Sequence, residues 1–252
     1  MAKGKRQALG TGRKIILIIC LMVFCGAAAY LGEYFLDNHK AQKGFGEIAD
    51  IKAEVGLEDI YRQNPDTIGW VNVPDTKIDY PVMQTKDDPE FYLHRDFNKE
   101  DSVSGTPFLA ADSNVGDSEG RGATWNWLIY GHNMKSGTMF HDLLKFEDQE
   151  FWNSHRTFTL DVIRNGEVES CEFEIFAACR ARILTKDEKG FRYYTYTGFT
   201  DEETFNEFVA GVQKQSLIDT GITPKFGDQL VTFSTCAYHT DEGRFYIVGV
   251  MK

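Results

Sequence analysis

A cysteine close to the C-terminus is the residue of this chain whose position best fits nucleophilic chemistry. Cys236 ends the segment QLVTFSTC, whose alternating apolar residues predict a strand over 229–236. The polar stretch AYHTDEG follows directly, so we expect the thiol at the exposed end of a strand. A thiol needs a neighbouring base or cation to become a nucleophilic thiolate near neutral pH.

Two further residues at predicted strand ends can supply that activation. The segment TWNWLIYGHN is an apolar strand that runs into His132, and Arg244 opens the last predicted strand eight residues after Cys236. An imidazole can act as general base and acid, and a guanidinium stays charged and can stabilise an oxyanion. Together the three residues are sufficient for acyl transfer through a thioester, without a metal or an organic cofactor.

Each of these residues also has a simpler interpretation when it is taken alone. A lone cysteine most often packs in a core, and a histidine at a strand end is usually a surface residue. Arg244 has Asp241 and Glu242 as neighbours for a surface ion pair. The functional interpretation therefore depends on the three side chains meeting in space.

The elements that must position these residues are mostly strands. Two helices, 138–152 and 200–217, interrupt the series, and Thr200 with Glu203 forms a capping-box pattern at the start of the second. Because strands and helices do not alternate regularly, we expect a closed or nearly closed barrel. The predicted strands are 68–73, 78–83, 106–111, 125–131, 156–162, 171–180, 229–236 and 244–250.

The N-terminal region predicts a membrane anchor. Residues 15–31 carry no charge, five basic and no acidic residues lie within 1–32, and acidic residues follow. We therefore expect a cytoplasmic segment over 1–14, one transmembrane signal anchor over 15–36 and an extracellular remainder. A cleaved signal peptide with its site near Ala27–Ala29, a lipoprotein cysteine and a buried core helix are the alternatives.

The region outside the anchor divides into a stalk and one domain. Residues 37–64 have helical spacing with glycines at 44, 46 and 56, which predicts a stalk and one or two short helices. Residues 65–252 form the predicted barrel domain.

The composition limits the function and the disulfides that can be expected. A net charge of −11 disfavours general nucleic-acid binding. Cys171 and Cys179 fall in one predicted strand, about 26 Å apart at ~3.3 Å per residue, too far to form a disulfide.

At this point the residues resemble a known family. Thr232–Cys236 (TFSTC) is similar to the TLxTC signature of sortases, with Phe233 in place of the usual leucine. Tyr130–His132, with Asn133 and Met134, resembles the histidine segment of class B sortases. Segments 64–93 and 137–146 and the helix at 200–217 are similar as well, so the resemblance covers roughly residues 45–252.

The resemblance implies a mostly β, eight-stranded sortase-type barrel with N-terminal helices and a long helix between late strands. It implies a single-pass cysteine transpeptidase, outside the membrane of a Gram-positive-type envelope. Such an enzyme cuts a C-terminal sorting motif of a surface protein, holds that protein as a thioacyl intermediate and passes it to an amine of a cell-wall precursor or a pilin lysine.

The resemblance also implies the roles of individual residues. Cys236 would be the nucleophile, His132 the acid and base, and Arg244 the stabilising cation. Substrate contacts would come from Ser234, Thr235, the amide of Ala237, Tyr130 and Tyr194.

Three alternatives stay open on the sequence. A hydrolytic extracellular cysteine peptidase shares the chemistry and uses water as the acceptor. A metal-dependent hydrolase would draw on His132, His141, His155, His239 and Cys236, although the HExxH pattern does not occur. A non-catalytic, membrane-tethered binding module would not need Cys236 at all.

Overall fold

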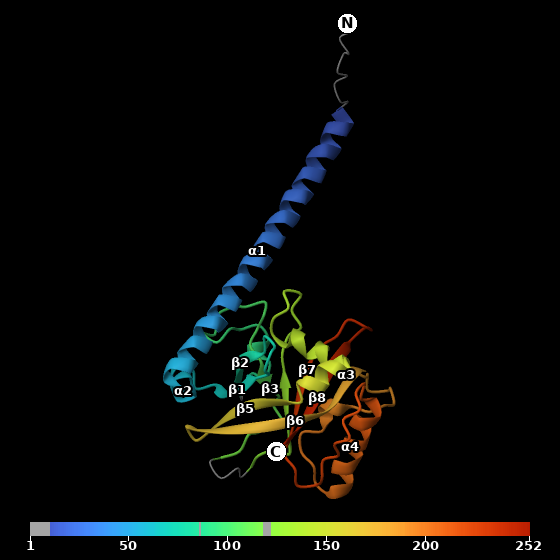
Figure 1. Ribbon diagram of the computed structural model, residues 1–252. Coiled ribbons are helices and arrows are strands. Elements are labelled where there is room, and N and C mark those ends of the chain that lie inside the picture. Colours follow the sequence, from blue (N-terminus) through green and yellow to red (C-terminus); the bar gives the residue numbers. More distant parts are fainter. Residues whose placement is uncertain (1–10, 86, 118–121) are drawn as a thin grey trace.

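The computed structural model describes residues 11–85, 87–117 and 122–252, and its central element is a closed β-barrel (Figure 1). The strands follow one another around the barrel in the order β1-β2-β3-β4-β7-β8-β6-β5. β2 pairs with β3 and β4 pairs with β7 in parallel, and the other neighbours are antiparallel. The strands are β1 Thr67–Asn72, β2 Asp79–Met83, β3 Phe108–Leu109, β4 Asn126–Tyr130, β5 Thr157–Arg164, β6 Glu167–Arg182, β7 Leu230–Cys236 and β8 Gly243–Met251.

The eight predicted strands are confirmed, with different ends. The strand predicted over 106–111 is only two residues long, and the one predicted over 171–180 extends to 16 residues as β6. The register of β6 against β8 shifts between Ile175 and Ala177. A bulge of this kind adds a residue to one strand and bends it, so one long strand can curve around the barrel.

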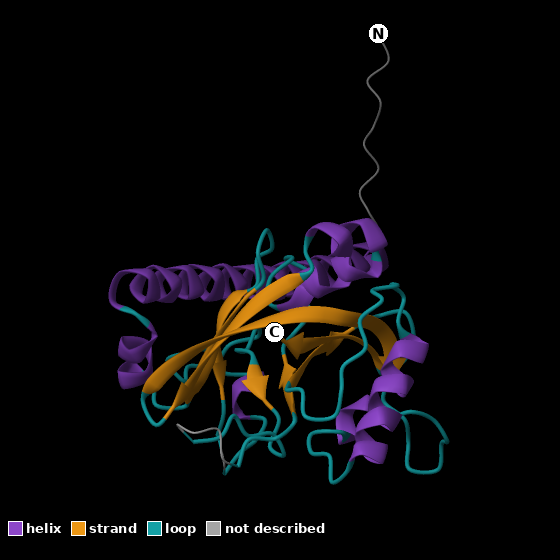
Figure 2. Ribbon diagram, turned by 60° about the horizontal axis from the view of Figure 1, so that its bottom comes forward, coloured by secondary structure: helices purple, strands orange, loops and turns teal. Residues whose placement is uncertain are grey.

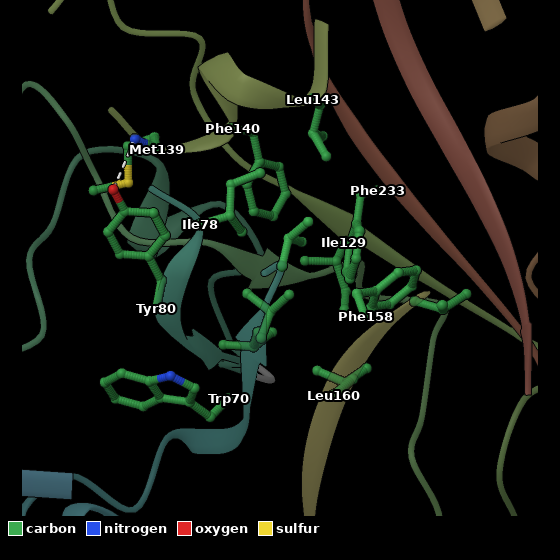
Figure 3. Packing of buried hydrophobic residues seen from close by; sticks show 14 of the residues in the cluster. Trp70, Ile78, Tyr80, Ile129, Met139, Phe140, Leu143, Phe158, Leu160 and Phe233 are labelled. Carbon is green, nitrogen blue, oxygen red and sulfur yellow. Dashed lines mark hydrogen bonds between the residues drawn. The ribbon is translucent and has the colours of Figure 1, made fainter. Parts of the chain in front are cut away.

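The core has two parts because side chains of a strand alternate between its faces. Phe233 points into the barrel, where its ring centroid lies 5.4 Å from that of Phe140 and 4.9 Å from that of Phe158 (Figure 3). On the other face of the same strands, Tyr246 and Val248 pack with the helix α4 (Glu202–Gln215). The phenylalanine that replaces the usual signature leucine is therefore a residue of the barrel interior.

The N-terminal helix differs from the expected stalk with glycine interruptions. Helix α1 (Thr11–Val55) is one continuous helix that runs through Gly44 and Gly46, and it ends only before Gly56, whose φ is +91°. Its first part extends away from the barrel, and its last turns lie beside the barrel (Figures 1 and 2). In these last turns, residues 38, 41, 45 and 48 form a buried stripe. Because this stripe has helical spacing, burial against the barrel compensates for the low helix propensity of the glycines. Helix α2 (Leu57–Gln63) follows.

The N-terminal part of α1 has the length and hydropathy of a membrane-crossing helix. Its most apolar stretch has a mean hydropathy of 2.6 and none of that stretch is buried within the protein. Large apolar side chains such as Leu21, Val23 and Phe24 are each more than half exposed. In water such exposure is unfavourable, so this segment is suited to a lipid environment. The alternative of a buried core helix is wrong.

Two predicted helix details are also wrong. The single helix expected over 138–152 is a 3₁₀ helix, η2 (Phe140–Glu147), followed by the short helix α3 (Gln149–Ser154), because Asp148 caps the second. The cap of α4 is Asp201, whose carboxylate accepts the Thr204 amide at 2.8 Å. Thr200 instead donates its hydroxyl to Asp201. A carboxylate one residue later reaches the free amides of the first turn, so the capping box at Thr200 does not form.

Candidate active site

The barrel brings three strand ends together at one rim. β4 and β7 run parallel, so Tyr130 and Cys236 end them on the same side, and β8 begins on that side because it is antiparallel to β7. In the register between β7 and β8, Cys236 is the direct partner of Arg244. We call the group formed by residues 130–133, Cys236 and Arg244 the rim. Strand pairing therefore brings together residues that lie up to 114 positions apart in the chain, from Tyr130 to Arg244.

Cys236 lies at the beginning of a tight hairpin. The thiol is partly exposed and unpaired, and the next residue, Ala237, donates its amide to the Gly243 carbonyl at 3.0 Å. A Cβ added to Gly243 would lie 2.1 Å from the Ala237 oxygen, so only glycine fits at this close approach. The hairpin holds Arg244 beside the cysteine without a longer loop.

The segment that carries His132 is hydrogen-bonded to the segment that carries Cys236. The Gly131 amide donates to the Ser234 carbonyl at 3.1 Å, and the Thr235 hydroxyl donates to the Gly131 carbonyl at 2.7 Å. Two residues after Gly131, the Asn133 side chain donates to the Cys236 carbonyl at 2.8 Å. His132 is thus held between two residues that both bind the Cys236 segment.

A backbone carbonyl fixes the orientation of His132. The Nε2 atom lies 2.9 Å from the Leu93 carbonyl oxygen, and since a carbonyl only accepts, Nε2 carries the hydrogen. This contact takes the place that a carboxylate holds in a protease triad. Burial lowers the pKa of His132, the Leu93 bond opposes this effect, and the His94 imidazole, whose ring centroid is 5.9 Å away, lowers the pKa further. The imidazole is therefore neutral at neutral pH and able to accept a proton.

Arg244 is held partly by its own hairpin. Its Nη1 donates to the Gly243 carbonyl at 3.0 Å, and its Nη2 lies 3.6 Å from a carboxylate oxygen of Glu242. The Glu242 side chain is 70% exposed, so this ion pair contributes little. Arg244 also lies near Tyr130: burial raises the pKa of Tyr130 to about 12, and the positive charge of Arg244 opposes that rise. The guanidinium thus remains available at the rim.

The five predicted substrate contacts fall into two groups. Ser234 and Thr235 are buried and engaged, the first with the Tyr193 hydroxyl at 2.8 Å and the second with Gly131, and the amide of Ala237 binds Gly243. Tyr130 and Tyr194 keep partly exposed rings, and the Tyr194 hydroxyl accepts the Leu184 amide at 3.1 Å. Polar groups of the first set are therefore occupied within the protein, while the two tyrosines present free ring surface.

Two features of the site escaped sequence reasoning. Leu93 contributes only its main-chain oxygen, a group that every residue type carries. The identity of the residue therefore gives no signal of this contact. Asn133 belongs to the segment that resembles the histidine segment of class B sortases, but its sequence neighbours do not indicate that its side chain reaches Cys236. Both contacts come from the pairing of distant segments, and a sequence pattern reports only local periodicity.

The histidines considered for a metal site do not gather in one place. Within the described part of the chain, the His, Cys, Asp and Glu side chains form no group of three that could hold a metal ion. His155 binds the Phe151 carbonyl and stacks on the Phe151 ring. A metal-dependent hydrolase built on these residues therefore has no support in the geometry.

Comparison with known proteins places this geometry in a family. Sortase B of Listeria monocytogenes is 34% identical over 206 residues, which is 81% of this chain and 75% of that protein. The crystal structure of sortase B from B. anthracis is 28% identical and has a TM-score of 0.72, over 86% of this chain and 98% of that one. A sortase B–substrate complex from Staphylococcus aureus, 22% identical, has the same fold with a TM-score of 0.73, over 86% and 98%. No family model matches the chain.

The barrel and these relatives define a sortase, a cysteine transpeptidase. Within the sortases, the chain belongs to the class B family, sortase B. The resemblance inferred from the TFSTC and histidine segments is confirmed, as is the barrel with its N-terminal helices and its helix between late strands.

Proposed function

We propose that this protein is a membrane-anchored transpeptidase that cleaves a sorting motif of a surface protein and transfers that protein to an amine. The observation that carries the proposal is the rim itself, where Cys236 pairs with Arg244 and the His132 segment is bonded to the Cys236 segment. Cleavage of a C-terminal motif, and an acceptor amine on a cell-wall precursor or a pilin lysine, are inferred from the family. The Staphylococcus aureus sortase B that shares this fold was solved as a complex with its substrate.

The first half-reaction forms a thioester. His132 accepts the proton of the Cys236 thiol, and the sulfur attacks the carbonyl carbon of the scissile peptide bond. Arg244 stabilises the negative charge that develops on the carbonyl oxygen. As the tetrahedral intermediate collapses, the C–N bond breaks and His132 returns its proton to the leaving amine. The surface protein is then held as an acyl group on the Cys236 sulfur.

The second half-reaction reverses these roles with a new nucleophile. The acceptor amine attacks the thioester carbon while His132 removes one of its protons. The sulfur leaves as the C–S bond breaks, and the imidazolium restores the thiol. Each proton taken is returned, so we propose that Cys236, His132 and Arg244 carry the chemistry without a cofactor. The lowered pKa of His132 supports this cycle, because a neutral imidazole begins it.

We assign substrate contacts to the rim and its borders. The rings of Tyr130 and Tyr194 are suited to apolar side chains of a bound peptide, close to the charge of Arg244. Ser234, Thr235 and the peptide of Ala237 would act mainly by shaping the site, since their hydrogen-bonding groups already have partners.

The membrane arrangement is also part of the proposal. Residues 1–14 would lie in the cytoplasm, 15–36 would cross the membrane, and the stalk and helices over 37–64 would carry the catalytic barrel of 65–252 outside. The exposed apolar surface of α1 and the basic residues before it support this orientation. Docking of α1 on the barrel, for example Lys52 to Asp161 at 3.2 Å, then attaches the barrel to the end of the anchor helix.

A product analysis tests this function. The full chain in detergent is incubated with a panel of sorting-motif peptides, with and without oligoglycine or a diamine, and products are identified by mass spectrometry. We expect a cleaved peptide joined to the amine, and no product from Cys236→Ala. Cleavage products that never contain the added amine would instead identify a hydrolytic peptidase. Peptide binding that is unchanged in Cys236→Ala, with no cleavage by either protein, would identify a binding module.

A further inference from the structure

The side chain of Asn133 connects the two segments of the rim. Its Nδ2 donates to the Cys236 carbonyl at 2.8 Å, and its Oδ1 lies 2.7 Å from Nδ1 of His141. Asn133 is only 8% exposed, so neither contact is readily replaced by water. Because one end of the amide must donate to a carbonyl, the other end is the acceptor, and Nδ1 of His141 carries the hydrogen. Both the neutral Nδ1–H form and the imidazolium of His141 can donate this bond.

The contact with Asn133 acts on the peptide bond next to the nucleophile. The Cys236 carbonyl and the Ala237 amide belong to one planar unit. Asn133 holds its oxygen, and the Gly243 carbonyl holds its N–H at 3.0 Å on the other side. With both ends bound, this unit cannot rotate, and the Cα–Cβ direction of Cys236 is held with it. Asn133 also follows His132 directly, so the same residue ties the imidazole segment to the sulfur segment.

The loop after His132 is built to return His141 to Asn133. Gly137 and Met139 have φ values of +75° and +55°, and Asn133 forms an isolated antiparallel bridge with Met139. The Phe140 amide donates to the His132 carbonyl at 2.9 Å. Tyr80, from β2, accepts the Met139 amide at 3.1 Å, the contact drawn as a dashed line in Figure 3. A non-glycine residue at positive φ is strained, so packing of the loop must maintain this conformation.

We propose that Asn133 and His141 are a positioning pair that holds the peptide unit after Cys236 and so sets the sulfur relative to the His132 imidazole. This inference rests on the proposed function of the rim. His141 does not act on substrate; it fixes the amide orientation of Asn133, and Asn133 fixes the Cys236 peptide. Displacement of reacting groups by about 1 Å can lower a rate about 10²-fold.

Matched substitutions separate the hydrogen bond from the bulk of the side chain. His141→Leu and His141→Asn introduce side chains of similar size, but only asparagine carries an N–H near the position of Nδ1. Asn133→Leu removes both bonds of the pair, and the double variant Asn133→Leu/His141→Leu tests their coupling. His155→Leu is the control, since the contacts of His155 are with Phe151 and Asp75 and not with Asn133 or Cys236.

The first readout is steady-state ligation by the full chain in detergent. We expect Asn133→Leu and His141→Leu to lower kcat about 10- to 100-fold with KM nearly unchanged, because substrate contacts are intact. His141→Asn should recover most of the lost kcat, and the double variant should be no slower than Asn133→Leu. His155→Leu should keep the wild-type kcat. Wild-type kcat in His141→Leu, or a double variant in which the two losses multiply, would overturn the proposal.

The second readout needs no substrate and therefore separates this inference from the proposed function. The rate at which iodoacetamide alkylates Cys236 is followed by peptide mapping across a pH series. We expect slower alkylation in His141→Leu and a rate near wild type in His141→Asn; equal rates in the two variants would contradict the pair. If the wild-type protein ligates no peptide, the proposed function fails, and these rates still decide the positioning role. If Asn133→Leu does not fold, the two His141 variants decide it alone.

Discussion

The thiols of β6 and the thiol at the end of β7 belong to one barrel but have different surroundings. Cys171 and Cys179 are 3% and 0% exposed. Burial raises the pKa of Cys171 to about 11 and that of Cys179 to about 12, so both remain protonated and unreactive near neutral pH. Cys236 is partly exposed and pairs with Arg244. A cysteine is therefore a packing residue in the middle of β6 but a candidate nucleophile at the end of β7.

The two regions also differ in what surrounds the sulfur. In the interior of β6, Cys179 has a contact with the Val212 carbonyl at 3.4 Å and packs against apolar residues of α4. At the rim, the sulfur of Cys236 belongs to a segment that is bonded to the histidine loop and paired with a cation. Desolvation alone suppresses thiolate formation, whereas a nearby base and a cation promote it.

The largest effect that tests this comparison is expected from Cys236→Ala. Removal of the proposed nucleophile, which would form the covalent intermediate, should reduce ligation roughly 10⁴-fold or more. Cys171→Ala and Cys179→Ala should retain activity, because neither thiol reaches the rim. Ligation rates of the three purified proteins decide this. Loss of activity in Cys179→Ala with an unchanged melting temperature would remove the distinction between the two regions.

A large effect is also expected from His132→Gln. Loss of the proposed general base and acid should lower kcat by about 10²–10⁴-fold. In the wild-type protein, burial lowers the pKa of His132, so the imidazole stays neutral to lower pH than a free histidine. The activity profile should be bell-shaped, with its acid limb below the ordinary histidine pKa of 6.5. An activity independent of pH between about 5 and 10 would contradict the pairing of His132 with a thiol.

Substitution of Arg244 should have an intermediate effect. Arg244→Ala removes the charge that we propose stabilises the oxyanion, and it should lower kcat by about 10²–10³-fold. Arg244→Lys keeps a positive charge but loses the planar guanidinium, so its kcat should lie between those of the alanine variant and the wild type. Glu242→Gln serves as the control, since the exposed ion pair it removes is weak. If Glu242→Gln lowered kcat as much as Arg244→Ala does, the effect of Arg244 would have to come from its ion pair with Glu242 and not from stabilisation of the oxyanion.

Alkaline pH should destabilise the folded protein through the two buried thiols of β6. The folded protein raises the pKa of Cys171 and Cys179, so it binds their protons more tightly than the unfolded chain does. This contribution to stability is complete below the ordinary thiol pKa of 9.0 and is lost as the pH rises through that value toward 11 and 12. Urea unfolding at about pH 8 and pH 10 should show a smaller loss in Cys171→Ala/Cys179→Ala than in the wild type. An identical loss in both proteins would contradict this account.

The smallest effect is expected at the position that departs from the family signature. Phe233→Leu restores the usual residue but removes the ring contacts with Phe140 and Phe158. Because the side chain faces the barrel interior, we expect a loss of about 1 kcal/mol in the free energy of unfolding and nearly unchanged ligation. Denaturant titration and product analysis measure the two quantities. A tenfold loss of kcat at unchanged stability would show that this side chain reaches the rim.

Much of the fold was predictable because it depends on local patterns. Alternation and β-branched residues located all eight strands, and the uncharged run at 15–31 located an apolar helix. Helix limits were less predictable: α1 passes Gly44 and Gly46 because its buried stripe packs on the barrel, and Asp201 replaces Thr200 as the cap of α4. Packing and competition between neighbouring polar groups decide such ends, and neither is visible in a periodicity.

By itself, the sequence determined the residue types available for chemistry and the strand ends at which Cys236, His132 and Arg244 stand. The tertiary structure alone decided that β4 lies beside β7, that Cys236 pairs with Arg244, and that Leu93 and Asn133 supply contacts to the rim. The reason is that strand alternation is a local property of the chain, whereas neighbours in a closed barrel are selected by the burial of many side chains at once.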